Sequence, residues 1–228
     1  MVISLLVIST LGIFMSIVLL DSGAIRHCLI GLFLIGFLGM MGLLIANDNY
    51  HYGLKKVNTS QTVTLVSSVK GKLPVNMLLY QPLGNGTEKV YLYRTNASEK
   101  KPQPIPTKKI TTTVHQTTAS EATLVKTTTR WEYKNHWMKF LFALSGEKNT
   151  VQHHHYTFNV PATWLTLSTS QAKQLAKVMK DPAKQQAITA TVAKQVLGAV
   201  AKNPRLTAAQ RTDVQQRALK QALEAALN

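Results

Sequence analysis

The chain of 228 residues contains one cysteine and few acidic side chains. Because Cys28 stands alone, no disulfide can form within the chain and no zinc site can be built from several thiolates. Ten Asp and Glu residues stand against 26 Lys and Arg residues, and no Asp lies between Asp48 and Asp181. This long stretch leaves few candidates for the paired carboxylates that general acid–base catalysis often uses.

Motifs that mark common catalytic sites are also missing. The sequence has no His-Glu-x-x-His, no Gly-x-Ser-x-Gly, no phosphate-binding P-loop and no Gly-x-Gly-x-x-Gly. We therefore predict a noncatalytic protein that carries no organic cofactor.

The formal net charge of +16 lies almost wholly in the second part of the chain, since only Arg26 among the Lys and Arg residues precedes position 47. Such a charge indicates anionic partners and says little about the fold. The candidates are lipid headgroups, anionic envelope polymers and nucleic acid. Because no nucleic-acid recognition motif is present, a membrane-tethered nucleic-acid-binding protein is an alternative and not the main prediction.

Two long apolar runs open the chain. Val2 to Leu20 and Cys28 to Ala46 are each long enough, at 1.5 Å per residue, to cross a hydrocarbon layer of roughly 30 Å. They predict a transmembrane helical hairpin over residues 1–46, with spans of about 2–20 and 28–46. The alternative is a cleaved signal peptide followed by a single anchor, although the first run lacks the positively charged start of such peptides.

Small residues recur on one face of each predicted span. Lipid gives two helices no hydrophobic reason to associate, so close packing at small residues has to hold them together. Folding the hairpin about Ala24 sets Gly12 opposite Gly36 and Ser9 opposite Gly39. The predicted helix-packing residues are Ser9, Gly12, Ser16, Gly36, Gly39 and Gly42.

Residues 47–57 are predicted to be a juxtamembrane segment. Tyr50 and Tyr52 are typical of the headgroup level, and Lys55 and Lys56 suit anionic lipid. The soluble part that follows is rich in Thr, Ser, Asn and Gln, which favours an extracytoplasmic position, whereas Lys55 and Lys56 favour a cytoplasmic one. We predict a two-pass protein of the cell membrane whose soluble part faces outward.

Residues 58–164 are predicted to form an antiparallel β-rich domain. The stretches VNMLLYQ and EKVYLYRT flank a turn-rich connection and indicate a hairpin. Three prolines near 99–107 indicate an extended linker between two β units. Both HWMKFLFAL and VQHHHYTFNV are predicted to be strands, and their aromatic residues, together with Trp131 and Tyr133, are predicted to form the core.

From residue 165 to 228 the pattern predicts a basic helical tail rich in Ala, Gln and Lys. Asp181 and Pro182 are typical of a helix start, Asn203-Pro204 of a helix end, and Thr207 with Gln210 of a capping box. The predicted fold class is therefore membrane-anchored α+β, with a transmembrane hairpin, an antiparallel β-rich domain and C-terminal helices.

Three consecutive histidines form the one pattern that points to chemistry. On a strand, His153 and His155 share a face and could supply two metal ligands, with His136 as a third ligand from the preceding predicted strand. A solvated patch on a strand is the competing interpretation, and acids that could orient the imidazoles are scarce. A metal-binding envelope protein that holds a divalent ion is therefore a second alternative function.

The two-span hairpin, the Thr-rich strands and the Ala/Gln/Lys-rich tail together resemble an uncharacterised family of small membrane proteins from lactic acid bacteria. The resemblance covers most of the chain through layout and composition. It implies an accessory role beside multidrug exporters, and it carries no functional residues over to this sequence. The main prediction is thus a membrane-anchored accessory or interaction protein of the bacterial cell envelope, whose partner is a transporter or an anionic envelope polymer.

Overall fold

The computed structural model describes residues 1–69, 75–84, 88–144 and 150–227. The chain divides into two compact units. The first unit contains Met1–Thr59 and Thr127–His154, and the second contains Ser60–Lys126 and His155–Asn228. The order of helices and strands gives the predicted α+β layout of two apolar helices, a β-rich region and C-terminal helices.

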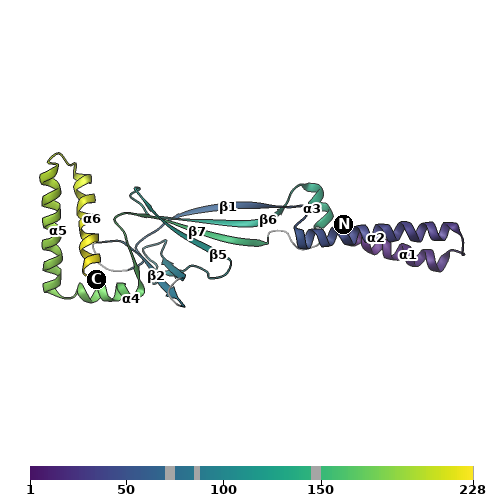
Figure 1. Cartoon of the computed structure of the whole chain (residues 1–228), viewed down its shortest axis with the longest axis horizontal. Helices are drawn as coiled ribbons and strands as arrows, with labels where there is room; N and C mark the ends of the chain where they lie inside the picture. Colours follow the sequence, from purple (N-terminus) through teal and green to yellow (C-terminus); the bar gives the residue numbers. More distant parts are fainter. Residues whose placement is uncertain (70–74, 85–87, 145–149, 228) are drawn as a thin grey trace. The chain divides into compact units, whose positions relative to one another are not determined.

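In the first unit, α1 (Val2–Leu19) and α2 (Ala24–Tyr50) form a hairpin, drawn in purple and blue in Figure 1. Both helices are long and apolar enough to cross a membrane. Helix α2 starts four residues before the predicted span and ends four residues after it, so residues 20–23 alone connect the two helices. At 1.5 Å per residue, α2 is about 40 Å long, which exceeds a hydrocarbon layer of roughly 30 Å.

A tight turn ends α2 and leads into β1 (Leu54–Thr64). His51 adopts the left-handed conformation with φ 53°, and Gly53 follows with φ 83°. The Asn47 side chain, which is buried, donates a hydrogen bond of 2.7 Å to the Tyr52 carbonyl. The predicted juxtamembrane segment at 47–57 is therefore divided between the last turn of a helix, this turn and the start of a strand.

One sheet has the strand order β1-β6-β7-β5, with β5 at Ile110–Thr117, β6 at Thr123–Tyr133 and β7 at Val151–Pro161. Between β6 and β7, the stretch predicted to be a strand forms instead the helix α3 (His136–Phe142). The helix begins there because the Asn135 side chain caps it, accepting a 2.9 Å hydrogen bond from the Met138 amide. The turn predicted at 145–149 lies outside the described residues.

The second sheet, in the second unit, has the order β4-β3-β2-β8. The predicted hairpin is confirmed, since β2 (Met77–Leu83) and β3 (Glu88–Tyr93) pair antiparallel. The proline-rich stretch is not a free linker, because Gln103–Pro104 pairs with β3 as β4 and Ile105 is buried. A proline is tolerated there because β4 is an edge strand.

The C-terminal region begins with a strand and not with a helix. Strand β8 (Leu165–Ser168) pairs parallel with β2, so the helical part starts at α4 (Thr169–Val178). Helices α5 (Pro182–Lys202) and α6 (Ala208–Ala225) follow and lie side by side (Figure 1). Leu165, Leu175 and Leu223 are fully buried in the core that these helices share with the sheet.

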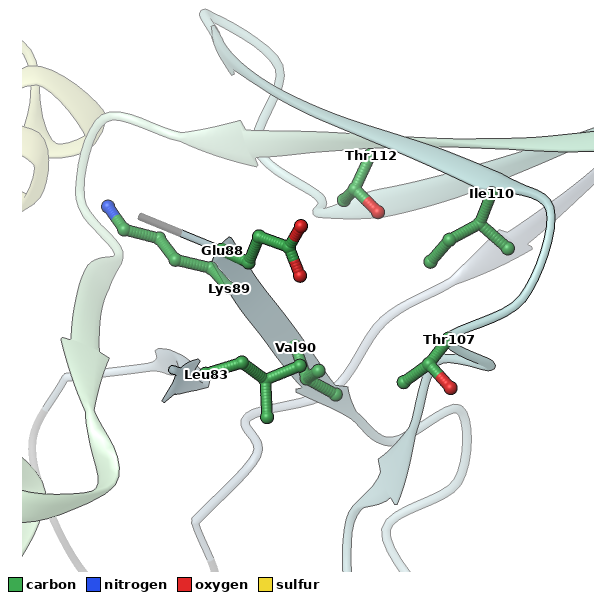
Figure 2. A pocket seen from close by; sticks show the side chains of 7 residues that line it. All are labelled: Leu83, Glu88, Lys89, Val90, Thr107, Ile110 and Thr112. Carbon is green, nitrogen blue, oxygen red and sulfur yellow. The ribbon is translucent and has the colours of Figure 1, made fainter. Parts of the chain in front are cut away.

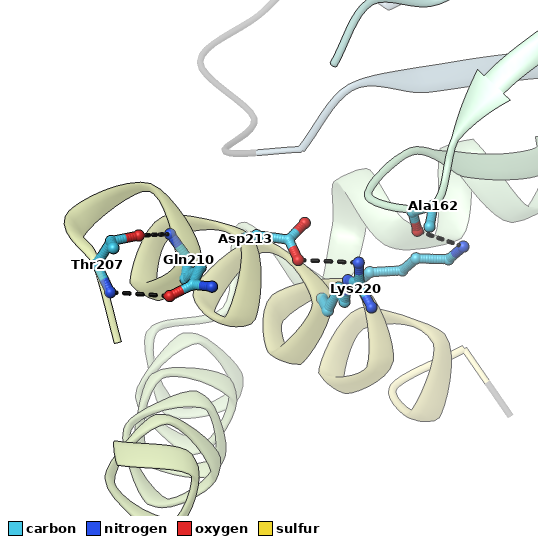
Figure 3. Close-up of polar contacts among 6 residues, drawn as sticks. Ala162, Thr207, Gln210, Asp213 and Lys220 are labelled. Carbon is cyan, nitrogen blue, oxygen red and sulfur yellow. Dashed lines mark hydrogen bonds and ion pairs between the residues drawn. The ribbon is translucent and has the colours of Figure 1, made fainter. Parts of the chain in front are cut away.

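The predicted caps of these helices are confirmed. Asp181 accepts a hydrogen bond from the Ala183 amide, and Pro182 is the first helical residue of α5. Figure 3 shows the reciprocal bonds of Thr207 and Gln210 that start α6, and the Lys220 ammonium donating a 3.0 Å hydrogen bond to the Ala162 carbonyl. The bonds at Asp181 and Thr207 satisfy backbone groups that a helix start would otherwise leave unpaired, and the Lys220 bond joins α6 to the turn after β7.

Candidate functional site

The α1–α2 hairpin is held by contacts one helical turn away from the predicted ones. A Cβ atom on Gly12 would lie 2.6 Å from the Phe33 ring, and one on Gly36 would lie 3.4 Å from the Ser9 hydroxyl oxygen. Gly12 therefore faces Phe33 and not Gly36, and Ser9 faces Gly36 and not Gly39. The register differs because α2 begins at Ala24, which shortens the connection about which the hairpin folds.

Gly39 and Gly42 do not take part in this seam. Among the described residues, no heavy atom beyond the neighbouring backbone of α2 lies within 4 Å of a Cβ built on either residue, and both are exposed. Ser9 and Ser16 are buried, and the Ser16 hydroxyl donates to the Gly12 carbonyl at 2.7 Å within its own helix. The small residues of α1 thus lie in the seam, whereas the predicted glycines of α2 beyond Gly36 lie outside it.

The outward surface of the hairpin is apolar and uncovered. The buried residues of α1 are Val2, Ser9 and Ser16, and the buried residue of α2 is Asn47. Large apolar side chains such as Leu11, Leu32 and Ile35 are exposed. An exposed apolar surface of this extent requires a cover, because soluble proteins rarely leave such patches in water.

Helix α3 contacts the open end of the hairpin, where α1 begins and α2 ends. The Met1 nitrogen donates hydrogen bonds of 3.3 and 3.1 Å to the Phe140 and Leu141 carbonyls. At the same open end of the hairpin, after α2, a Cβ on Gly53 would lie 3.0 Å from the Met138 sulfur, and the Gly53 carbonyl accepts a 2.9 Å hydrogen bond from the Lys134 amide just before the helix. Helix α3 therefore sits where the chain enters α1 and where it leaves α2.

The sequence predicted that the aromatic residues around α3 belong to the core, but only some of them do. Phe142 is buried, and its carbonyl accepts a 2.8 Å hydrogen bond from the Tyr133 hydroxyl. Trp137, Phe140 and Leu144 are instead exposed by 62%, 47% and 64%. We call these three residues the aromatic face. The rings of Trp137 and Phe140 stack with centroids 5.6 Å apart.

The predicted interface residues lie on the turn after α2 and on the strand that follows it. Tyr50 and Tyr52 are exposed, as are Lys55 and Lys56. The Lys56 ammonium lies 5.2 Å from the centroid of the Trp131 ring, and the His51 ring meets the same indole edge-on at 4.3 Å. A cation above an indole face is attracted by the negative face of the ring.

The histidines on β7 have different neighbours. The His154 ring nitrogen Nδ1 lies 3.0 Å from the Thr128 hydroxyl, on the face of β7 that also buries Tyr156 and Phe158. The His155 Nε2 atom lies 3.4 Å from the Thr113 hydroxyl. His153 is half-buried and lines an open polar hollow.

His136 does not lie on a strand next to β7, as the metal hypothesis assumed, because it is the first residue of α3. Among the described residues, no group of three or more His, Cys, Asp and Glu side chains is placed to hold a metal ion. His136, His153 and His155 are all described, so they do not form the predicted three-histidine site. The alternating directions of side chains on β7 still place His153 and His155 on one side of that strand.

The hollow beside His153 has a volume of about 460 Å³ and is lined by Lys56, Asn58, Thr129, Gln152 and His153. The Thr129 hydroxyl donates to the Asn58 side-chain oxygen at 2.8 Å. The described lining side chains are a cation, two amides, a hydroxyl and an imidazole, and none of them is a carboxylate. Such a set can donate hydrogen bonds to an anionic or hydroxyl-rich group. The sequence pattern singled out Lys56 and His153 separately and gave no signal that they are neighbours.

A second hollow, in the second unit, has a volume of about 280 Å³ (Figure 2). The Glu88 side chain extends toward Thr112, whereas that of Lys89 extends away from it, as expected for adjacent residues of a strand. The Lys89 ammonium lies over the Tyr80 ring, 4.7 Å from its centroid. With Glu88 as the one carboxylate among its described lining residues, this hollow offers no pair of acids.

Backbone groups fix the ionisable side chains near the end of β3. Arg94 is buried and donates hydrogen bonds to the Ser67 and Ala97 carbonyls at 3.1 and 2.6 Å. A hydrogen bond that the Thr95 hydroxyl donates to the Glu99 carboxylate, with further ones from the Thr95 and Asn96 amides, lowers the pKa of the Glu99 carboxyl. Since these partners are mostly local backbone atoms, the cluster is a structural turn and not a reactive site.

No curated protein and no solved structure is similar to the chain at a significant level. A family model does match, over residues 22–175, which is more than half of the chain. The matched range contains α2, α3 and both sheets, and it therefore includes the turn after α2, the aromatic face and the hollow beside His153. The chain belongs to the family described as Domain of unknown function (DUF4811).

Proposed function

We propose that this protein is a membrane-anchored, noncatalytic interaction protein of the bacterial cell envelope, and that its soluble part binds an anionic envelope polymer or a membrane transporter. The observation that carries the proposal is the uncovered apolar surface of the hairpin. A core helix of a soluble protein would be mostly buried, whereas α1 and α2 bury few side chains. Lipid is the cover that such a surface fits.

The packing of α1 favours a two-pass anchor over a cleaved leader followed by one span. Gly12 is in contact with Phe33, and the Met1 nitrogen is bonded to α3, so the structure would lose these contacts if α1 were removed. A hairpin also puts both ends of the membrane segment on one side. The soluble part then lies on a single side of the membrane, and its polar, Thr-rich composition favours the outer one.

The charge of the soluble part supports an anionic partner. Between described basic and described acidic side chains there are two ion pairs, Arg217 with Asp213 at 2.9 Å and Lys220 with Glu224 at 4.0 Å. Most of the 26 Lys and Arg residues therefore lack an acidic neighbour in the described part of the chain. In the hollow lined by Lys56 and His153, this charge lies beside hydrogen-bonding groups, and none of the described lining residues is a carboxylate.

Binding is tested with the full chain in lipid nanodiscs and a phosphate-linked polyol polymer as the probe. We expect binding that weakens steeply as salt is added, because exposed charges are screened over about 10 Å at 0.1 M salt. Lys56→Gln with His153→Gln should weaken the binding, and Lys184→Gln, an exposed residue of α5, serves as the matched control. Binding that is insensitive to salt, or equal in all three proteins, would refute the role of this hollow.

Anchoring is tested independently in the same proteins. The chain should stay with the membrane pellet through alkaline carbonate washing, which releases proteins held by charge alone. Release of the chain into the wash would refute the membrane anchor whatever the result of the polymer assay.

A further inference from the structure

We infer that the aromatic face, formed by Trp137 and Phe140 of α3 and by Leu144 in the turn that follows it, lies in the headgroup region of the bilayer and makes α3 an interfacial helix beside the two spans. This inference rests on the proposed membrane anchor and deepens it. The occupant of the face is lipid, at the boundary between headgroups and acyl chains.

One side of α3 packs against the rest of the protein, and the other side is exposed. Met138 and Phe142 point inward, where Met138 packs against Gly53 and the buried Phe142 is bonded through its carbonyl to the Tyr133 hydroxyl. Trp137 and Phe140 are three residues apart on α3, so they share the side of the helix away from Met138 and Phe142, and Leu144 follows in the turn after the helix. Since these large side chains have no cover within the described chain, they are available to a partner.

The depth of α3 follows from its contacts with the hairpin. Its carbonyls at Phe140 and Leu141 accept from the Met1 nitrogen, which is one residue before the first span begins. Gly53, which packs against Met138, is three residues after the last residue of α2. Both are points at which a hairpin that crosses the bilayer enters or leaves it. Helix α3, which carries Trp137 and Phe140, therefore lies at the level where the hairpin enters and leaves the bilayer.

The residue types suit this depth. Trp is enriched where a membrane meets water, because its ring is apolar and its N–H can reach water or a headgroup. Lys139, on the same helix, is exposed, as is Lys134 just before it. Cations at this level are attracted to anionic lipid. A surface that binds a transporter would not need aromatic rings and cations at the level where the spans leave the membrane.

The inference is tested by quenching of Trp fluorescence in vesicles made with phospholipids brominated either near the headgroups or near the bilayer centre. The chain has three Trp residues, so Trp137→Phe reports the signal of the other two, and the difference from the unchanged chain is the signal of Trp137. We expect that difference to be quenched at least about twofold more by the shallow bromines than by the deep ones, since an interfacial helix inserts only roughly 5–10 Å.

A second reporter separates this inference from the anchor on which it rests. Leu11→Trp in the Trp137→Phe chain places an indole near the middle of α1, and we expect the deep bromines to quench it most. If the indole at position 11 is quenched and Trp137 is not, the inference is overturned and the anchor stands. If neither is quenched, the proposed membrane anchor itself is refuted. Quenching of Trp137 chiefly by the deep bromines would also overturn an interfacial position.

Discussion

The chain contains two helical hairpins that differ in the side chains they place between their helices and on their outer surfaces. In the α1–α2 hairpin small residues meet at the seam, and large apolar side chains point outward. In the α5–α6 hairpin Ala218, Ala222 and Leu223 are buried, and the exposed positions are mostly polar or charged. The difference lies in what faces outward, and it favours the proposal that lipid surrounds the first hairpin and water the second.

The largest expected difference between the two hairpins is the effect of adding charge to the outer surface of each. Ile8→Lys with Leu11→Lys puts two ammonium groups on exposed positions near the centre of α1, at a cost of about 2.5–3.5 kcal/mol each. We expect the chain to lose most of its resistance to carbonate extraction. The matched pair Ala193→Lys with Leu197→Lys, on exposed positions of α5, should leave extraction unchanged. Equal resistance to carbonate extraction in the two variants would contradict the proposal that lipid surrounds only the first hairpin.

A core deletion in the second hairpin should have a large effect on stability and none on anchoring. Leu223 is fully buried in the core of the second unit, so Leu223→Ala removes packed atoms and leaves a cavity. We expect a loss of about 2–5 kcal/mol in the free energy of unfolding. Denaturant titration of the full chain in detergent, followed by circular dichroism, measures it. Reduced carbonate resistance in this variant would mean that the two hairpins are not independent.

Adding a single methyl group at Gly12 tests the register in which α1 and α2 pack. Gly12→Ala drives a Cβ into the Phe33 ring, and we expect a loss of about 1–3 kcal/mol from this overpacking. Phe33→Ala in the same chain should recover part of that loss by making room. Gly39→Ala is the control, because its Cβ meets no atom within 4 Å. Titration with a denaturing detergent reports the separation of the helices, and equal losses at positions 12 and 39 would refute the described register.

The smallest expected effect concerns the cap of α6. Thr207→Ala removes the hydroxyl that accepts a 3.3 Å hydrogen bond from the Gln210 amide. We expect a loss of about 1 kcal/mol, typical of an N-cap. Thr207→Ser keeps the hydroxyl and should retain most of the stability, measured by the same denaturant titration as for Leu223→Ala. An effect of Thr207→Ala as large as that of Leu223→Ala would mean that the cap holds more than one helix end.

What the sequence predicted well depends on neighbours in the chain. The Asp181-Pro182 start and the Thr207/Gln210 capping box each act within one helical turn, so a short window contains the whole interaction. The β2–β3 hairpin is equally local. The two apolar helices were predictable because their composition is extreme, although the register of their seam was missed when their connection was taken to be longer than it is.

What the sequence did not predict depends on distant partners. Strand β8 has only four residues and is defined by its parallel pairing with β2, more than eighty residues earlier in the chain. The nearly continuous apolar residues of α3 predict a strand, whereas the cap that makes them a helix is a single side chain, Asn135. Neither the neighbourhood of Lys56 and His153 nor the aromatic face could be predicted, since both follow from the way distant segments pack.

The measurement that tests the central claim most directly determines on which side of the membrane the α1–α2 connection lies and on which side the soluble part lies. Cys28→Ser removes the native thiol, and either Ser22→Cys, in the α1–α2 connection, or Lys202→Cys, at the end of α5, then provides a single exposed thiol. Intact cells are treated with a membrane-impermeant thiol reagent. A spanning hairpin with an outward soluble part predicts labelling at position 202 in intact cells and at position 22 only after lysis. Labelling of both positions in intact cells, or of position 22 alone, would contradict it.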